Sequence, residues 1–204
     1  PEILQFVNIG YSFSNNKIIN PYNINLDLES SDDFTKANIQ INYTYSLNKK
    51  KKIKARFYVG KVITTNDTND NYDLQMSAWN GTNDYSFSEK ALVRDNLQTN
   101  KLPYQQQIFI KEGGLKHFTN LTSNNWLSSC SAEYNLTKIF RLYLEAGTNG
   151  VNFAYGSGLR IPLLRNMLNF YFPLYTEEGL VKFDKSYKDV MRFNLNIKLN
   201  LNLF

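Results

Sequence analysis

The stretch from Met191 to Phe204 alternates apolar and polar residues without interruption up to Leu203, and the aromatic Phe204 follows. Because successive side chains of a β-strand point to opposite faces, this pattern predicts a strand with one apolar and one polar face. Ordinary strands have about 5 to 6 residues, whereas a tilted strand that crosses a bilayer needs about 9 to 11. The length therefore predicts a membrane-spanning strand in the outer membrane of a Gram-negative bacterium. Its lipid-facing residues would be Phe193, Leu195, Ile197, Leu199 and Leu201.

The same alternation recurs along the chain and is interrupted once, by the segment 80–124. Nine further segments have strand character: 3–14, 23–29, 36–47, 53–60, 72–79, 125–136, 140–146, 151–163 and 167–175. We expect an all-β fold, namely an antiparallel up-and-down transmembrane β-barrel of about ten strands, with eight or twelve also compatible. Residues 1–204 would form this single domain, and 80–124 would be a long loop that is extracellular or folded inward.

Composition leaves both a membrane protein and a soluble protein open. No apolar run is long enough for a transmembrane helix, and the mean hydropathy of −0.44 is that of a soluble protein. Average hydropathy is nearly blind to a β-barrel, however, because only every second residue of its strands meets lipid. Aromatic residues make up 15% of the chain, which suits the aromatic girdles of a barrel. The alternative is a soluble or surface-attached β-sandwich that binds a ligand through its aromatic residues.

The net charge of +5 raises the question of a nucleic-acid partner. Much of the excess lies in one run, Lys49 to Lys52, between two predicted strands. Because no nucleic-acid-binding motif accompanies the run, we interpret it as a solvated loop and expect no nucleic-acid partner. Contact with anionic lipopolysaccharide would suit such a loop equally well. The single cysteine, Cys130, excludes an internal disulfide framework.

Both ends of the sequence bear on export. The segment Pro1 to Gln5 has neither a basic region nor an apolar region of a signal peptide. We expect either an exported, porin-like protein without its signal peptide or the C-terminal part of a larger protein. At the other end the chain stops at an aromatic residue, Phe204. Terminal aromatic residues that the barrel-assembly machinery recognises usually share the phase of the apolar face, whereas Phe204 has the phase of Arg192 and Asn202.

The orientation of a barrel follows from its links. Bacterial barrels keep both termini and the short turns on the periplasmic side. Counting back from Phe204, the long links 80–124 and 176–190 fall outside the cell, and the short links 137–138 and 164–166 fall on the periplasmic side.

The polar positions of the predicted strands carry charges of both signs. The predicted lumen charge network consists of Arg56, Asp73, Glu133, Arg141, Glu145, Arg160 and Arg192. About ten strands enclose a narrow interior, so these charges would pair across it. The prediction is a barrel filled by side chains or by a plug.

Catalytic motifs are missing from the sequence. His117 is the only histidine, so no zinc motif and no Ser/His/Asp or Cys/His arrangement can be argued from spacing. The pair Gly113-Gly114 lacks the Lys-Ser/Thr of a phosphate-binding loop, and Gly156-Ser157-Gly158 lies in a predicted strand. We therefore expect no enzyme activity, no metal and no cofactor, and we interpret His117 as a loop residue without a role.

Several phrases carry a family resemblance. They are Ala55 to Lys61, Gln105 to Gln107, Glu112 to Lys116, Gly158 to Ile161 and Leu168 to Tyr175. Together they resemble the C-terminal outer-membrane β-barrel region of M1-like (gluzincin) metallopeptidases of Bacteroidota and, more loosely, Omp85-like surface-antigen barrels.

The resemblance implies a membrane anchor that carries a peptidase or another module on its N-terminal side. No residue of this chain corresponds to the zinc ligands or the general base of that family. The sequence thus predicts a non-catalytic outer-membrane barrel that acts as an anchor, a scaffold or a narrow transport element. Its partners would be membrane lipid, lipopolysaccharide, the barrel-assembly machinery and other envelope proteins.

Overall fold

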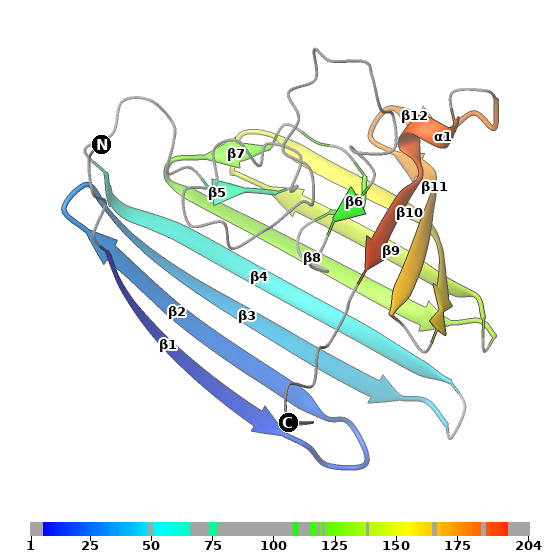
Figure 1. Ribbon diagram of the computed structural model, residues 1–204, viewed down its shortest axis with the longest axis horizontal. Coiled ribbons are helices and arrows are strands. Elements are labelled where there is room, and N and C mark those ends of the chain that lie inside the picture. The colour runs from blue at the N-terminus through cyan, green and yellow to red at the C-terminus, as the bar shows by residue number, and fades with distance from the viewer. Residues whose placement is uncertain are drawn as a thin grey trace, which may run out of the picture.

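One large antiparallel sheet dominates the fold (Figure 1). The computed structural model describes residues 6–48, 51–65, 74–76, 108–109, 115–117, 119, 121–137, 139–164, 167–184 and 187–195. Of the eleven strands of this sheet, β6 and β12 have two residues each, which leaves nine principal strands. In sheet order they are β1 (Phe6–Asn15), β2 (Tyr22–Ser31), β3 (Phe34–Ser46), β4 (Lys52–Thr65), β8 (Trp126–Asn135), β9 (Arg141–Thr148), β10 (Phe153–Leu163), β11 (Leu168–Thr176) and β13 (Arg192–Leu195).

The prediction of an all-β fold with an antiparallel sheet of about ten strands is confirmed. The small elements are β6 (Ile108–Phe109), parallel to β13; β12 (Gly179–Leu180), which pairs with β11; β5 (Leu74–Gln75) and β7 (Thr122–Ser123), which pair with each other; and the helix α1 (Tyr187–Val190). Within the described residues, no helix is long and apolar enough to cross a membrane.

One predicted strand does not join the large sheet. The segment 72–79 was expected to follow β4 in the sheet, but β4 pairs directly with β8, from Ile53 with Tyr134 to Lys61 with Trp126. Of that segment, Leu74 and Gln75 pair with β7 in the separate two-stranded sheet. The apolar side chains of Leu74 and Met76 are buried, so their alternation reflects packing against the large sheet instead of membership in it.

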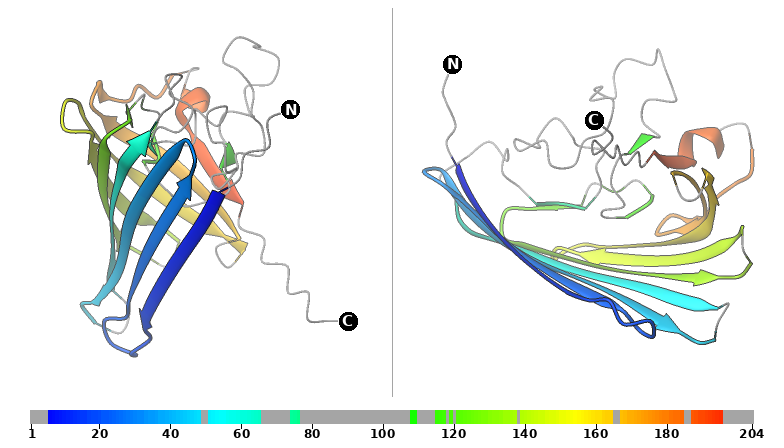
Figure 2. Two further views of the ribbon diagram at one scale, coloured as in Figure 1. Left: turned by 90° about the vertical axis from the view of Figure 1, so that its left-hand side faces the viewer. Right: turned by 60° about the horizontal axis from the view of Figure 1, so that its bottom comes forward.

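The large sheet is curved and open (Figure 2). Strand β1 forms one edge, and β13 with the short β6 forms the other. The predicted closure into a barrel is thus not seen among the described strands. Strands β5 and β7 lie on the inner side of the curve (Figure 2), which we call the concave face.

The pairing register puts the apolar alternating residues of all nine principal strands on one side. For example, Ile9 is opposite Leu28, Ile41 is opposite Phe57, and Phe170 is opposite Phe193. This side is the outer one, which we call the convex face. Many of its large apolar side chains are exposed, among them Val7, Ile9, Leu26, Phe57, Leu144 and Phe153.

The hydrophobic core is small and lies on the concave face. Val62, Leu127 and Ala154 contribute from the sheet, and Leu74, Met76, Leu115 and Leu121 contribute from the connection between β4 and β8. Part of this connection is therefore folded inward and covers the concave face. None of these seven core residues lies on the convex face.

The connections divide between two ends of the sheet. Because neighbouring strands run in opposite directions, the β4–β8 and β11–β13 connections lie at one end, which we call the long-connection end (Figure 1). The β8–β9 and β10–β11 links lie at the opposite, short-turn end, as does the turn between β3 and β4 that contains Lys51. The sequence had predicted the same grouping of the two longest and two short links.

The direct pairing of β4 with β8 can be tested with the native cysteine. Phe57 is opposite Cys130 on the convex face, and side chains at such positions have their Cβ atoms about 4.5 to 5.5 Å apart. We expect the substitution Phe57→Cys to give a rapid disulfide with Cys130 under mild oxidation, detected as a shift on a non-reducing gel. Tyr58→Cys, which points to the concave face, should stay reduced. Equal cross-linking of the two variants would contradict the register.

Candidate functional site

A cluster of one histidine and two glutamates holds part of the β4–β8 connection against the concave face. We call Leu115, Lys116, His117, Thr119 and Leu121 the docked segment; all five are buried. His117 Nδ1 lies 2.9 Å from Oε1 of Glu145 in β9, and Nε2 lies 2.8 Å from Oε2 of Glu177 in the turn after β11. The imidazole thus joins the docked segment to two separate parts of the sheet.

Glu145 receives backbone donors as well as the ring. Its Oε1 accepts hydrogen bonds from the amides of Lys116 (2.6 Å) and His117 (3.2 Å). Its Oε2 is buried and makes no hydrogen bond to any described residue. Burying a carboxylate without hydrogen-bond donors costs free energy. The donors of the docked segment therefore stabilise the buried Glu145, and Glu145 in turn holds the docked segment in place.

Gly156 in β10 provides the space for the imidazole. A Cβ atom at this position would lie 2.5 Å from Nδ1 of His117, closer than real Cβ atoms approach other atoms. A glycine inside a strand often marks such a close approach. The Gly156-Ser157-Gly158 motif is therefore part of the packing of the concave face, with Ser157 on the opposite side of the strand.

The charge state of His117 is set by its two partners. Burial works to lower the pKa of the imidazole, but the hydrogen bond and charge of Glu145 and those of Glu177 outweigh it and raise the pKa above the ordinary value of 6.5. A raised pKa means that the contribution of His117 to docking is complete below the ordinary value. It is lost as the pH rises through the pKa of the folded state.

A second cluster surrounds Arg160 in β10. Its Nη1 donates to both carboxylate oxygens of Glu133 at 2.7 Å, and its Nε and Nη2 donate to Oδ1 of Asn169. The guanidinium carbon lies 5.4 Å from the ring centre of Tyr171, and Nζ of Lys116 lies 5.6 Å from the same ring. In this cluster the charges of Arg160 and Glu133 pair with each other on the concave face of the sheet.

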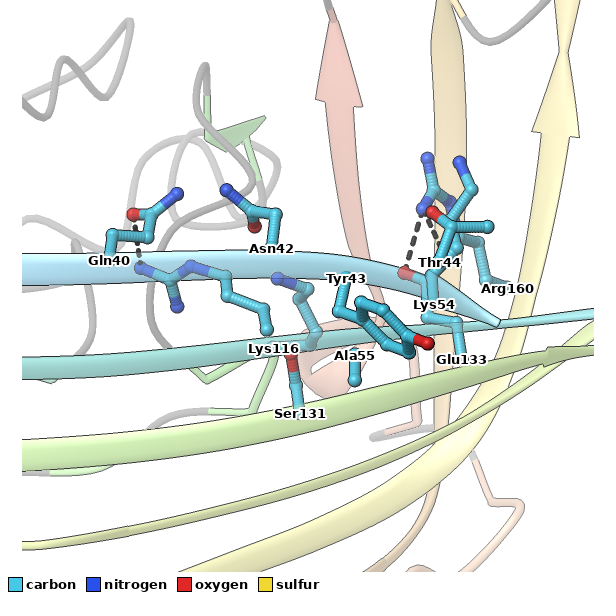
Figure 3. Close-up of a pocket in the computed structure, with 11 residues that line it drawn as sticks. Gln40, Asn42, Tyr43, Thr44, Lys54, Ala55, Lys116, Ser131, Glu133 and Arg160 are labelled. Atoms are coloured by element: carbon cyan, nitrogen blue, oxygen red, sulfur yellow. Dashed lines mark hydrogen bonds and ion pairs between the residues drawn. The ribbon is translucent and has the colours of Figure 1, made fainter. Parts of the chain in front are cut away.

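A polar cavity of about 380 Å³ lies beside the Arg160 cluster (Figure 3). Its lining includes Arg56, Lys116, Glu133 and Arg160, with uncharged polar groups such as Gln40. Arg56 donates to Gln40 across the wall of the cavity at 3.1 Å. The lining brings together more cationic than anionic side chains, so the cavity suits a small anionic or polar solute better than a cation.

The structure brings most of the predicted lumen residues to the concave face. The register places Arg56, Glu133, Arg141, Glu145, Arg160 and Arg192 on that face. Asp73 lies outside the described residues. Of the predicted lipid-facing set, Phe193 and Leu195 pair with Phe170 and Leu168 of the convex face, whereas Ile197, Leu199, Leu201 and Phe204 lie outside the described residues.

Sequence reasoning missed the role of His117. It was interpreted as a loop residue without a role, but it is buried between two carboxylates. Its partners lie far from it in sequence, so spacing alone could not reveal the cluster. The available signal was Gly156, a glycine at a concave position of a predicted strand.

Neither a metal site nor a family assignment emerges from these observations. Within the described residues, no group of three or more His, Cys, Asp or Glu side chains could hold a metal ion. Comparison of the sequence with known protein families and with curated proteins found no matching family and no significantly similar protein. The two faces of the sheet and the contacts on them are therefore the observations that bear on function.

The single histidine allows a direct test of the cluster. We expect the NMR titration of His117 to have its midpoint above pH 6.5, because two carboxylates favour the imidazolium. Glu177→Gln should lower the midpoint, since it removes one of these charges. Glu178→Gln, at the exposed neighbouring position, should leave it unchanged. A wild-type midpoint at or below 6.5 would show that the cluster does not form.

Proposed function

We propose that this chain forms an outer-membrane β-barrel that serves as an anchor or scaffold in the cell envelope and has no catalytic activity of its own. The observation that carries the proposal is the continuous apolar convex face across nine strands, set against a concave face with charged residues. A soluble sheet of this kind would bury its apolar face. Here the arrangement is reversed, as it is when lipid surrounds a polar interior.

The strand lengths support the same environment. Strands β1 to β4 have 10, 10, 13 and 14 residues, and β8 to β11 have 10, 8, 11 and 9. A tilted strand that crosses the hydrocarbon core needs about 9 to 11 residues. These strands are longer than the usual strands of soluble proteins and match the thickness of a bilayer.

The β-sandwich alternative is disfavoured by what lies on each face. A sandwich needs a second sheet against the apolar face. Among the described residues, the small β5–β7 sheet packs on the concave face, and no second sheet covers the convex face. Large exposed apolar side chains lie on the convex face of neighbouring strands from β1 to β4 and from β9 to β10, whereas soluble monomers rarely expose extended apolar patches.

The filled interior favours an anchor over an open pore. The docked segment, the His117 cluster and the Arg160 cluster occupy the concave face. The polar cavity of about 380 Å³ lies among the described residues of this face, and a narrow transport path would run there. The resemblance to the barrel region of M1-like metallopeptidases of Bacteroidota supports the anchoring role and suggests a peptidase module on the N-terminal side.

The orientation follows from the ends of the sheet. With the long-connection end outside the cell, the β4–β8 and β11–β13 connections would meet lipopolysaccharide. The lysine turn between β3 and β4 lies at the other end, so it would face the anionic headgroups of the periplasmic leaflet. The barrel-assembly machinery would insert the chain in this direction.

A pair of neighbouring substitutions on β3 tests the proposal. Ile39 lies on the convex face opposite Leu26 and Val59, and Asn38 lies on the concave face opposite Asp27. We expect Ile39→Lys to lower the free energy of unfolding from lipid vesicles by about 2 to 4 kcal/mol, the cost of a lysine near the bilayer centre.

Asn38→Lys is the matched control. It adds the same charge to the concave face beside Asp27, so its effect should stay within about 0.5 kcal/mol. Urea titration of both variants in vesicles measures the difference. If Ile39→Lys is as well tolerated as Asn38→Lys, the convex face meets water and the membrane proposal is wrong.

A further inference from the structure

The two long connections of the sheet meet at one side chain. The docked segment belongs to the β4–β8 connection, and Glu177 lies in the turn between β11 and β12, where the β11–β13 connection begins. His117 Nε2 lies 2.8 Å from Oε2 of Glu177, and Nδ1 lies 2.9 Å from Oε1 of Glu145. The imidazole of His117 therefore links the two long connections to each other and to strand β9.

The turn that carries Glu177 is a tight hairpin. Thr176 pairs with Gly179, and Gly179 has a φ of 105°, a conformation that glycine adopts without the steric cost of a Cβ atom. The hairpin holds the backbone of Glu177 at the end of β11. Its side chain is 32% exposed, so the carboxylate can reach either His117 or water.

The two contacts of the imidazole need two protons. An ionised carboxylate only accepts hydrogen bonds, and a neutral imidazole has one N–H, whereas the imidazolium has two. With both carboxylates ionised, His117 can donate to Glu145 and Glu177 together only as the imidazolium. The direction of its pKa agrees, because both carboxylates raise it.

Loss of one proton affects the two contacts differently. The side chain of Glu145 is fully buried, and its Oε1 also accepts from the amides of Lys116 and His117, so this carboxylate is held in place. In the neutral ring, Nδ1–H keeps its hydrogen bond to Glu145, and the lone pair of Nε2 faces the negative charge of Glu177. This contact is repulsive, and the partly exposed Glu177 can turn to water instead.

The other elements around the imidazole bring further groups that bear on a pH dependence. Strand β10 presents Gly156 to the ring, β9 carries the buried Tyr143, and the turn carries the exposed Glu178. Lys116 of the docked segment lines the polar cavity (Figure 3). Lysine and tyrosine side chains ordinarily titrate at about pH 10 and carboxylates at about pH 4, so a change between about pH 6 and pH 9 is assigned to His117.

We propose that the imidazolium of His117 is a pH-dependent clasp that holds the β4–β8 connection against the β11–β12 turn, and that loss of one proton to water opens the clasp at Glu177. The clasp is closed below the ordinary imidazole value of 6.5 and opens as the pH rises through the higher pKa of the folded state. When it is open, the docked segment stays bound to Glu145, and the turn is released from it. This device does not depend on what covers the convex face, so it is independent of the proposed function.

A spin label in the turn tests the clasp. In a Cys130→Ser background, Glu178→Cys places a nitroxide at the exposed position next to Glu177. We expect an immobilised component in its spectrum below the midpoint of the His117 titration, and loss of that component as the pH rises through the midpoint. A label at Val151 is the control, because this residue is 89% exposed in the β9–β10 turn at the same end of the sheet. Its spectrum should not change between about pH 6 and pH 9.

A second variant, Glu177→Gln, separates the clasp from a general loosening of the turn. A glutamine amide can accept from Nε2–H or donate to a bare Nε2, so the label at position 178 should keep its immobilised component throughout the titration. The inference is overturned if the label next to the native Glu177 shows no change through the His117 midpoint. It is equally overturned if the Glu177→Gln variant shows the same change, or if the label at Val151 changes together with the label in the turn.

Discussion

The pairing of nine alternating strands in one common phase is the constraint on which the rest of this structure depends. In each strand, apolar and polar residues take alternate positions, and the register aligns Ile9 with Leu28 and Ile41 with Phe57. A slip of one residue in any pair would move a whole set of side chains to the other face. Because the alternation of all nine strands is in register, the sheet has one apolar and one polar side. Each side needs an environment of its own kind.

The concave face follows from that separation. Charges such as Glu145, Arg160 and Glu133 are forced to one side of a curved sheet, where they need partners. Arg160 donates hydrogen bonds to Glu133 and Asn169 within the sheet. Glu145 instead bonds to backbone amides and the imidazole of the docked segment. The inward folding of the β4–β8 connection is thus coupled to the charge pattern of the strands. Gly156 makes the approach sterically possible.

The sequence was sufficient for the features that depend on local pattern. Alternation predicted the strands on both sides of the long connection, the common face of Arg56, Glu145 and Arg160, and the grouping of long links at one end. Alternation did not predict the features that depend on pairing between residues far apart in the sequence. Leu74 and Met76 alternate like residues of a strand in the large sheet, but they belong to the core on its concave face, because β8 pairs with β4 in the place expected for them. His117 meets its partners only in the folded chain, since Glu145 lies in β9 and Glu177 lies in the turn after β11.

Cys130 offers the most direct measurement of the central claim, that lipid covers the convex face. It is the single cysteine of the chain, and it is free and exposed on that face. A nitroxide label there, in protein reconstituted in vesicles, should relax strongly with dissolved oxygen and weakly with a water-soluble nickel complex. A label at Ser131 in a Cys130→Ser background should be less accessible to oxygen, because Ser131 lies on the concave face. Strong relaxation of the Cys130 label by the nickel complex would mean that water covers the convex face, which contradicts the account.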